Sequence, residues 1–569
     1  MSTKKIVSCD LVTIACLGFC AMPLHAQKKE AKKPNIIVIL TDDMGYSDIG
    51  CYGSEIRTPN IDKLASTGLR FTQYYNTARS SSTRASLLTG LYPHQAGMGH
   101  LANYNFAEPG YKDDLSKNTV TMAEVFKSAG YSTYMTGKWH VSKSITPKGD
   151  ISNWPLQRGF DRFFGTLNGS GSYYDPGTLI SNNTFIAPGK GFYYTNAIAD
   201  TTVKFINQHP KQKPFFFYVA FTAAHWPLHA PESEVAKYKG IYNNGWDKTR
   251  ENRFNKLKKL GIIDNRCVLT ERGVKIPAWE NEPMKAWQVR RMEVYAAMID
   301  IMDQGVGHII SALEKNGLLN NTVVFYMHDN GGCAEPQDTD KPEIPLTAEQ
   351  KVLKPMSVDS VYLGKRPEYS RDGYFVRSGR GVMAGPADSW VAYGEEWANV
   401  SNTPFRLYKH YTHEGGIASP LIISWPTGIK AKGELRRQPS HLIDIMATCI
   451  DIAGLNYPTQ FNGNQIIPYE GKSLKPAFTN KSIDRKFIFW EHEGNRAIRV
   501  GVWKLVSKTA KAMKFISTDE NTWELYDLKK DPSETNNLAA IYPKRVKEMA
   551  ELWETEAIRT TAKPWPWNK

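Results

Sequence analysis

Beyond its first 26 residues, the chain lacks any apolar run of the roughly 20 residues that a membrane-spanning helix needs. The apolar part of that first stretch, residues 11–23, is too short as well, so the sequence predicts no transmembrane segment. Internal repeats and recognised nucleic-acid-binding modules are also missing. The first absence excludes a membrane-spanning protein, and the last removes nucleic acid from the expected partners.

Cysteine is scarce, with seven in 569 residues, and three of the seven stand at positions 9, 16 and 20. The other four, Cys51, Cys267, Cys333 and Cys449, are widely scattered. This spacing excludes a zinc knuckle and a disulfide framework. One or two disulfides stay open for an exported protein.

The first 26 residues have the pattern of an export signal: a basic start at 4–5, a mostly apolar stretch at 11–23, and Ala26 before a cut. We therefore predict a signal peptide over residues 1–26 and an exported, periplasmic protein. A lipid anchor on one of the two cysteines in the apolar stretch is an alternative, although neither follows a good lipobox. Secretion from the cell is a second alternative to a periplasmic location.

The formal net charge is +14, from 71 Lys and Arg against 57 Asp and Glu. A positive surface raises the local concentration of anionic substrates. It would equally suit nucleic acid, so the charge alone does not choose between these partners.

Length and composition predict one large domain and a smaller one, because 569 residues with 41% hydrophobic content exceed a single simple core. Apolar runs typical of strands alternate with helical patterns, which indicates an α/β fold. The predicted strands are 35–40, 131–135, 215–221, 323–327 and 420–425, and the predicted helices are 120–129 and 289–315. Four of these strands end in a loop that carries Asp, His, Lys or Asn, at the sheet edge where α/β folds bind ligands.

The C-terminal part of the chain has a different character. Residues 335–400, rich in Pro, Gly and charge, indicate a long insertion of the kind that is usually functional or mobile. From about residue 470, short strand patterns with turns indicate a small antiparallel sheet closed by a helix near 542–555. Those strand patterns are 486–490, 497–500, 503–506 and 523–528. We predict a catalytic α/β domain over residues 27–470 and an α+β subdomain over 471–569.

The stretch 77–90 carries the strongest functional signal. Ser80 stands four residues before Arg84, and both open an apolar helical pattern. A helix N-terminus offers unpaired N–H groups and the positive end of the helix dipole, which favour anions. A hydroxyl beside Arg84 is therefore placed to act on a negatively charged group, although an ordinary Ser/Thr helix cap gives the same pattern.

Two pairs of oxygen ligands follow buried strands: Asp42-Asp43 after residues 35–40, and Asp329-Asn330 after residues 323–327. Ca²⁺ prefers several carboxylate and amide oxygens, whereas zinc favours nitrogen or sulfur. One such pair alone would more often form a turn. Two pairs, each after a buried strand, predict a calcium site.

Four further side chains stand in loops after predicted strands or beside glycine-rich turns. Lys138 suits an anionic oxygen, and His140 titrates near neutral pH. His225 precedes Trp226, and Lys409 precedes the turn at 414–416 by five residues. Each of them alone would more often be structural.

Six stretches resemble the motifs of type I sulfatases, in the order and approximate spacing of that family. They are 35–43, 80–90, 137–140, 329–332, 409–416 and 524–528. One such motif would be a weak signal, but six in order are specific. The family belongs to the alkaline phosphatase superfamily, so the resemblance implies a large mixed β-sheet sandwiched by helices and a smaller C-terminal antiparallel-sheet subdomain.

The resemblance also implies a role for each matching residue. Ser80 would be oxidised after translation to formylglycine (3-oxoalanine), and Arg84 would steady this nucleophile. The side chain at position 80 would bind one Ca²⁺ together with Asp42, Asp43, Asp329 and Asn330. The groups around the sulfate would be Lys138, His140, His225 and Lys409.

In the mechanism that this family implies, the hydrated aldehyde attacks sulfur, and cationic side chains stabilise the transition state. His225 or Lys409 would protonate the leaving alcohol. His140 would then take the proton of the second hydroxyl, which expels sulfate and restores the aldehyde.

Two positions depart from the family pattern: Ser82 replaces the usual proline, and Ser80 stands where the oxygen-dependent generating enzyme needs cysteine. The expected maturation partner is therefore a serine-type radical maturase, as in anaerobic bacteria.

For the substrate we expect a sulfated carbohydrate or an aryl sulfate ester, because many Trp and Tyr side chains suit stacking on sugar rings. Selectivity is expected from residues 100–104, 170–175 and 335–400. Two alternatives stay open. One is a phosphatase or phosphodiesterase of the same superfamily that uses Ser80 directly with a second metal cluster, for which residues 225–340 stay open. The other is an unmodified glycan-binding pseudoenzyme.

Overall fold

The computed structural model describes residues 1–6, 8, 33–509 and 522–566. It divides into two units, Met1–Lys33 and Pro34–Lys569, and the helices and strands of the described residues belong to the second. Most of the predicted signal peptide lies outside the described residues, as do Cys9, Cys16 and Cys20. In the described part of the chain, no helix is both long and apolar enough to cross a membrane.

The strands are β1 Asn35–Thr41, β2 Leu69–Tyr75, β3 Ser132–Lys138, β4 Arg162–Thr166, β5 Leu179–Ser181, β6 Thr184–Phe185, β7 Phe215–Ala220, β8 Thr322–His328, β9 Ala418–Ser424, β10 Glu434–Arg436, β11 Ser440–His441, β12 Gln460–Phe461, β13 Asn464–Gln465, β14 Ile488–His492, β15 Asn495–Val500, β16 Trp503–Ser507 and β17 Glu524–Asp527. The α-helices are α1 Pro59–Thr67, α2 Ser80–Thr89, α3 Met122–Ser128, α4 Tyr194–Asn207, α5 Glu232–Val235, α6 Gly245–Lys259, α7 Lys285–Lys315, α8 Gly394–Ser401, α9 Glu414–Ile417, α10 Asp444–Ala453, α11 Lys475–Phe478 and α12 Pro543–Arg559.

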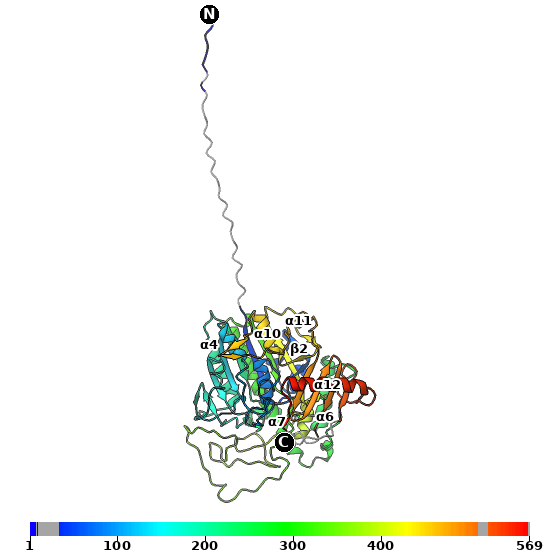
Figure 1. Ribbon diagram of the computed structural model, residues 1–569. Coiled ribbons are helices and arrows are strands. Elements are labelled where there is room, and N and C mark those ends of the chain that lie inside the picture. Colours follow the sequence, from blue (N-terminus) through cyan, green and yellow to red (C-terminus); the bar gives the residue numbers. More distant parts are fainter. Residues whose placement is uncertain (7, 9–32, 510–521, 567–569) are drawn as a thin grey trace. The chain divides into compact units, whose positions relative to one another are not determined.

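A large mixed sheet forms the centre of the second unit (Figure 1). Its order is β10-β2-β9-β8-β1-β7-β3-β4-β5-β6, with β11 also paired to β2. Strands β8, β1, β7, β3 and β4 run parallel, so their carboxyl ends meet at one edge. Strand β9 runs antiparallel to β8, so the residues that precede β9 reach the same edge.

Helices cover both faces of this sheet, because alternate residues of each buried strand point to opposite sides. On one side, Ile37 and Ile39 belong to a buried cluster with α4 and α7, which pack against each other. On the other, Val38 and Leu40 belong to a cluster with α2, α3 and α10.

The C-terminal sheet is antiparallel, in the order β14-β15-β16-β17. Its apolar residues Phe489 and Leu505 form a separate buried cluster with Trp553 of α12, the red helix in Figure 1. The predicted α/β class, with a large mixed sheet and a small C-terminal antiparallel sheet, is confirmed. The domain boundary near residue 470 stays a prediction.

Strand β3 is longer than the sequence pattern predicts: it runs through Lys138, which that pattern places in a loop. Gly137 permits this extension, since it lies between two strands and a Cβ at this position would come within 1.9 Å of the Ala220 carbonyl oxygen. The strand therefore carries Lys138 into the interior, where its ammonium group finds a carboxylate partner.

The four cysteines beyond the first 33 residues are buried and unpaired, so the one or two disulfides left open for them do not form. The insertion at 335–400 contains one helix only at its end, α8, among the described residues. Before that helix it forms the long olive loops at the lower edge of Figure 1.

Candidate active site

The predicted metal ligands meet because β1 and β8 are paired in register. Thr41 lies opposite His328, and the Asp329 N–H donates to the Thr41 carbonyl at 3.0 Å. Asp42-Asp43 and Asp329-Asn330 therefore leave the sheet side by side. The Asn330 amide donates to Asp43 Oδ1 at 2.7 Å, and the Asp43 N–H donates to Asp329 Oδ1 at 3.1 Å.

Helix α2 brings Ser80 to these ligands as its first residue. Thr83, one turn along, donates through its hydroxyl to the Asp329 carbonyl at 2.6 Å, which fixes the helix start against the end of β8. Ser80 Oγ lies 3.0 Å from Asp42 Oδ1, 2.6 Å from Asp329 Oδ2 and 3.4 Å from Asn330 Oδ1. Only 2% of the residue is exposed, so its hydroxyl faces the carboxylates rather than solvent.

Three buried cations neutralise this cluster. Arg84 contacts Asp42 at 3.1 Å and Asp329 at 3.3 Å, and the Lys138 ammonium donates to Asp42. The Lys409 ammonium donates to Asp43 Oδ2 at 3.0 Å. Burial opposes ionisation of Asp42, but Lys138 and Arg84 outweigh it and hold the pKa of this carboxyl below its usual range.

Two buried histidines flank the cluster. The His225 Nδ1–H donates to the Trp226 carbonyl at 2.7 Å, so the Nε2 lone pair of the neutral ring faces Asp43 Oδ2 at 3.4 Å. Burial lowers the pKa of His225 to about 4, and burial together with Lys138 lowers that of His140 well below 6.5. Both rings are therefore neutral at pH 7.

The donor set fits a hard cation. One hydroxyl proton on Ser80 serves one of its three acceptors, so the other contacts bring oxygen lone pairs together. Burial and the Asp42 carboxylate raise the pKa of Asp329 to about 7, so a cation beside this carboxyl would favour its ionised form. Oxygen atoms of Asp42 and Asp43 and a nitrogen of His225 lie within 4.8 Å of one another. A calcium ion fits these residues better than zinc does.

Sequence reasoning missed a second layer of charged residues behind the cluster. Glu335 accepts from Arg79 at 3.1 Å, from His410 at 3.0 Å and from the Trp226 indole at 2.9 Å, and it lies 3.8 Å from Lys409. His410 lies within the recognised stretch 409–416 and Glu335 follows the stretch 329–332, and this is the only signal that the sequence held.

A further buried group in this layer comes from the C-terminal sheet: His492 and Glu493, at the β14–β15 turn, meet His410. Glu493 lies 2.7 Å from His410 and 3.0 Å from His100. The phosphatase alternative requires a second metal cluster, which the sequence allowed within residues 225–340. Among the described residues, the second group that could hold a metal ion is His410, His492 and Glu493, and none of them lies within 225–340.

A small pocket of about 120 Å³ opens onto Ser80, His140, His225 and Lys409. All three segments from which we expected selectivity contribute to its wall, through Tyr104, Ser170 and Lys365. The structure thus brings the predicted catalytic residues and the predicted selectivity segments to one place.

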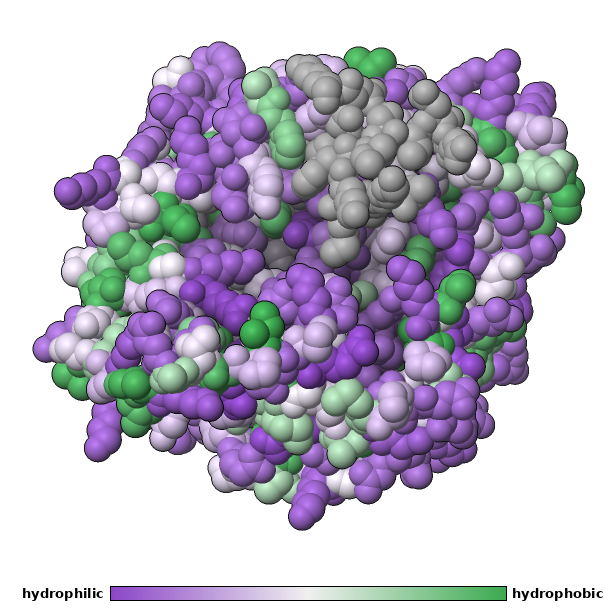
Figure 2. Space-filling model, turned by 90° about the horizontal axis from the view of Figure 1, so that it is seen from below, coloured by the Kyte–Doolittle hydropathy of each residue, from purple (hydrophilic) through white to green (hydrophobic). Residues whose placement is uncertain are grey.

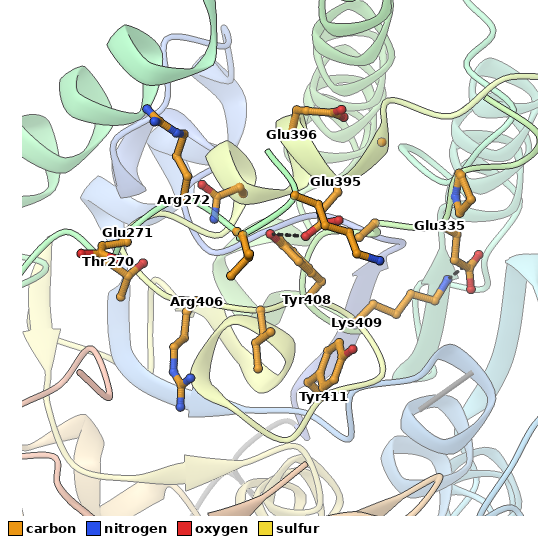
Figure 3. A pocket seen from close by; sticks show the side chains of 18 of the residues that line it. Thr270, Glu271, Arg272, Glu335, Glu395, Glu396, Arg406, Tyr408, Lys409 and Tyr411 are labelled. Carbon is orange, nitrogen blue, oxygen red and sulfur yellow. Dashed lines mark hydrogen bonds and ion pairs between the residues drawn. The ribbon is translucent and has the colours of Figure 1, made fainter. Parts of the chain in front are cut away.

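A larger cavity of about 1390 Å³ lies on the other side of the Lys409–Glu335 ion pair, since both residues line both spaces. Figure 3 shows this pair at one edge of the cavity, and Tyr408 turned toward Glu395. Figure 2 shows a hollow on the face seen from below, with mostly hydrophilic residues around it.

Comparisons with known proteins agree on one family. The sequence model named Sulfatase matches residues 34–455, and the model for the N-sulphoglucosamine sulphohydrolase C-terminal region matches residues 405–558. An uncharacterized sulfatase of Schizosaccharomyces pombe is 34% identical over 93% of this chain and 94% of its own length. An arylsulfatase of Klebsiella aerogenes is 34% identical over 79% of this chain and 92% of its own length.

A solved structure shares the fold with a TM-score of 0.58 and 23% identity, over 95% of this chain and all of the other. That structure is a complex of the protein with its substrate D-glucosamine-2-N,6-O-disulfate.

Proposed function

Because the chain belongs to the sulfatase family, whose members are sulfuric ester hydrolases, we propose that it removes sulfate from a sulfated carbohydrate with a formylglycine made from Ser80 and one bound Ca²⁺. The observation that carries this proposal is the place of Ser80 Oγ, within 3.4 Å of three predicted ligand oxygens and next to Arg84. An ordinary helix cap would instead direct the hydroxyl to its own helix.

In this proposal, Asp42, Asp43, Asp329, Asn330 and the side chain at position 80 hold the calcium ion. When bound, the ion neutralises carboxylates and polarises sulfate oxygens, and the formylglycine hydrate supplies the attacking oxygen. The remaining steps belong to the side chains around this group.

Cations orient the ester. Lys409 lines the pocket, and although burial opposes ionisation, Asp43 holds the pKa of its ammonium group above the usual range, so it stays charged at neutral pH. We assign it to a sulfate oxygen. Lys138 and Arg84 keep Asp42 ionised and so preserve the negative donor set.

The two histidines would move protons. The Nδ1–H of His225 is committed to the Trp226 carbonyl, so the neutral ring must first gain a proton at Nε2 before it can pass one to the leaving alcohol. Lys409 is the alternative donor. His140 is neutral, because burial lowers its pKa, and it can therefore take the proton that release of sulfate requires.

The carbohydrate substrate is supported by the surroundings of the pocket and by one structural neighbour. Tyr104 and Trp226 offer aromatic surface at the pocket, which suits sugar rings. The neighbour in complex with a disulfated glucosamine shares the fold. Aryl sulfate esters serve as the simpler test substrates.

We further propose that residues 1–26 direct export to the periplasm, that a serine-type maturase oxidises Ser80, and that the catalytic domain covers residues 27–470 and the C-terminal subdomain residues 471–569.

The decisive experiment is the mass of the peptide that contains residue 80, from protein purified out of its native host, together with metal analysis. We expect the loss of two hydrogens from Ser80, reactivity toward a carbonyl reagent, and one calcium per chain. Unmodified serine with two zinc ions would instead identify a phosphatase. Unmodified serine without sulfate release would identify a glycan-binding pseudoenzyme.

A further inference from the structure

Lys365 comes from the long insertion, yet the fold holds it at the pocket. The insertion is fixed to the loop around β5 on both sides of this residue. The Thr178 N–H donates to the Tyr362 carbonyl at 2.9 Å, and Arg371 forms an ion pair with buried Asp175 at 2.9 Å. The position of Lys365 is therefore set by contacts that lie outside the catalytic cluster.

The ammonium group of Lys365 lies 4.5 Å from the centre of the Trp226 ring, in cation–π geometry. Trp226 is itself fixed, because its indole N–H donates to Glu335 at 2.9 Å and its ring packs against Trp390. A rigid aromatic platform thus holds the Lys365 charge at the wall of the pocket that contains Ser80.

Lys365 differs from the other cations of this pocket, since it forms no ion pair with any of the described residues. Lys409 pairs with Asp43, and Arg79 pairs with Glu335. Within the part of the chain that the structure describes, no carboxylate lies within ion-pair distance of the Lys365 ammonium. Burial lowers the pKa of Lys365 to about 8; Glu335 opposes this shift, and Lys409 and Arg79 add to it. A bound anion would therefore stabilise the charged form of the Lys365 ammonium group.

We propose that Lys365 binds a second anionic group of the substrate, a carboxylate or a second sulfate close to the ester that is cleaved. This inference rests on the proposed function, since it extends the sulfate pocket to a substrate with two negative charges. The sulfate to be removed lies at Lys409 and the proposed calcium site, whereas the second anion meets Lys365 beside Trp226. Lys365 would then be a specificity-determining residue that the reaction itself does not use.

Binding to the full-length Ser80→Ala protein tests this without turnover. Calorimetry would compare two matched probes, 3-carboxyphenyl sulfate and its neutral amide 3-carbamoylphenyl sulfate, with the 2- and 4-isomers of both included. A charge-assisted hydrogen bond predicts about tenfold tighter binding of at least one carboxylate isomer over its amide. Added K365Q should reduce that ratio to about one.

The matched control is K354Q. Lys354 belongs to the same insertion and lies over the Tyr369 ring at 4.7 Å, but it does not line the pocket. We expect K354Q to leave the carboxylate-to-amide ratio unchanged. A third probe, 1,3-phenylene disulfate, shows whether a second sulfate binds better than a carboxylate.

The inference is wrong if the ratio is near one before the substitution, or if K365Q weakens all probes equally, since Lys365 would then only support the pocket. Both of these outcomes leave the proposed function intact. Failure of every sulfate ester to bind, with the protein folded, would overturn the proposed function and this inference together.

Discussion

At the scale of single residues, the proposed function gives the Ser80 hydroxyl a role that no neighbouring hydroxyl shares. We predict that Ser80→Ala lowers kcat/KM by at least about 10⁴-fold while the free energy of unfolding changes by less than about 1 kcal/mol. Sulfate release and urea unfolding measure the two effects.

Ser86 provides the control for this prediction. It lies in the same helix, is fully buried, and its hydroxyl has no hydrogen-bond partner among the described residues. Ser86→Ala should keep full activity. Equal activity of Ser80→Ala and Ser86→Ala would contradict the assignment of the nucleophile.

A second residue-scale prediction concerns the proton donor. If His225 protonates the leaving alcohol, His225→Gln should lower kcat/KM about 10³-fold for a sugar sulfate but only about tenfold for 4-nitrophenyl sulfate. The reason is that nitrophenolate leaves without a proton. Parallel assays on both substrates provide the measurement, and an equal loss on both would transfer the role to Lys409.

The residues of this site divide by how they could be recognised. Asp42, Asp329 and Ser80 follow strands or open a helix, so local pattern and motif spacing identify them. Glu335 and Glu493 could not be predicted. His410 contacts both, and Glu493 stands 83 residues further along the chain, so only the folded structure brings these groups together.

At the scale of elements, Asp303 joins α7 to the start of α1. Asp303 of α7 accepts hydrogen bonds from the N–H groups of Asn60 and Ile61 at the start of α1, at 3.1 and 2.8 Å. Burial nevertheless raises the pKa of Asp303 to about 6, because these hydrogen bonds do not fully offset desolvation.

The sign of the resulting pH dependence follows from this shift. The folded state binds the Asp303 proton more tightly than the unfolded state, whose pKa is near 3.8. The stability that this group contributes is therefore complete below pH 3.8 and is lost as the pH rises to about 6, by at most about 3 kcal/mol.

We predict that Asp303→Asn removes this part of the pH dependence. Urea unfolding of both proteins between pH 4 and 7 compares the two slopes, so a constant cost of the substitution does not matter. Parallel curves would show that Asp303 keeps an ordinary pKa.

The strands were easier to predict than the helices around them. Runs such as Asn35–Thr41 and Phe215–Ala220 are apolar on both faces, which marks a central strand directly. Short strands toward the two ends of the sheet, such as β5 and β10, carry no such signal, because three residues are too few for periodicity. The end of β3 was missed because a lysine at the last position of a strand pattern is typical of a loop. Lys138 is buried in the strand instead, because its ammonium group donates to the Asp42 carboxylate.

At the scale of the whole molecule, buried charges join the C-terminal sheet to the main sheet. Lys504 of β16 is inaccessible and pairs with Glu414 of α9 at 2.7 Å and with Glu534 at 2.8 Å. Glu414 also accepts from the Tyr75 hydroxyl of β2 at 3.1 Å. The two sheets are therefore connected by a network that loses its buried ammonium group if Lys504 is replaced.

We predict that Lys504→Met lowers the free energy of unfolding by about 3–5 kcal/mol, since it leaves two buried carboxylates without their cation. Lys530→Met is the control, because that lysine is exposed and lies 4.0 Å from its carboxylate partner. Urea unfolding of both variants measures the difference. Similar losses in both would mean that the network contributes little.

The contact between the β14–β15 turn and the residues beside Ser80 also has a consequence during synthesis. Roughly 400 residues separate Ser80 from Glu493, so at about 5–20 residues per second the ribosome needs on the order of 20–80 s to add them. Until then, the layer of His410 and Glu493 next to Arg79 cannot close. A modifying enzyme that needs an accessible Ser80 therefore has tens of seconds, while the chain is still being made, in which to reach it.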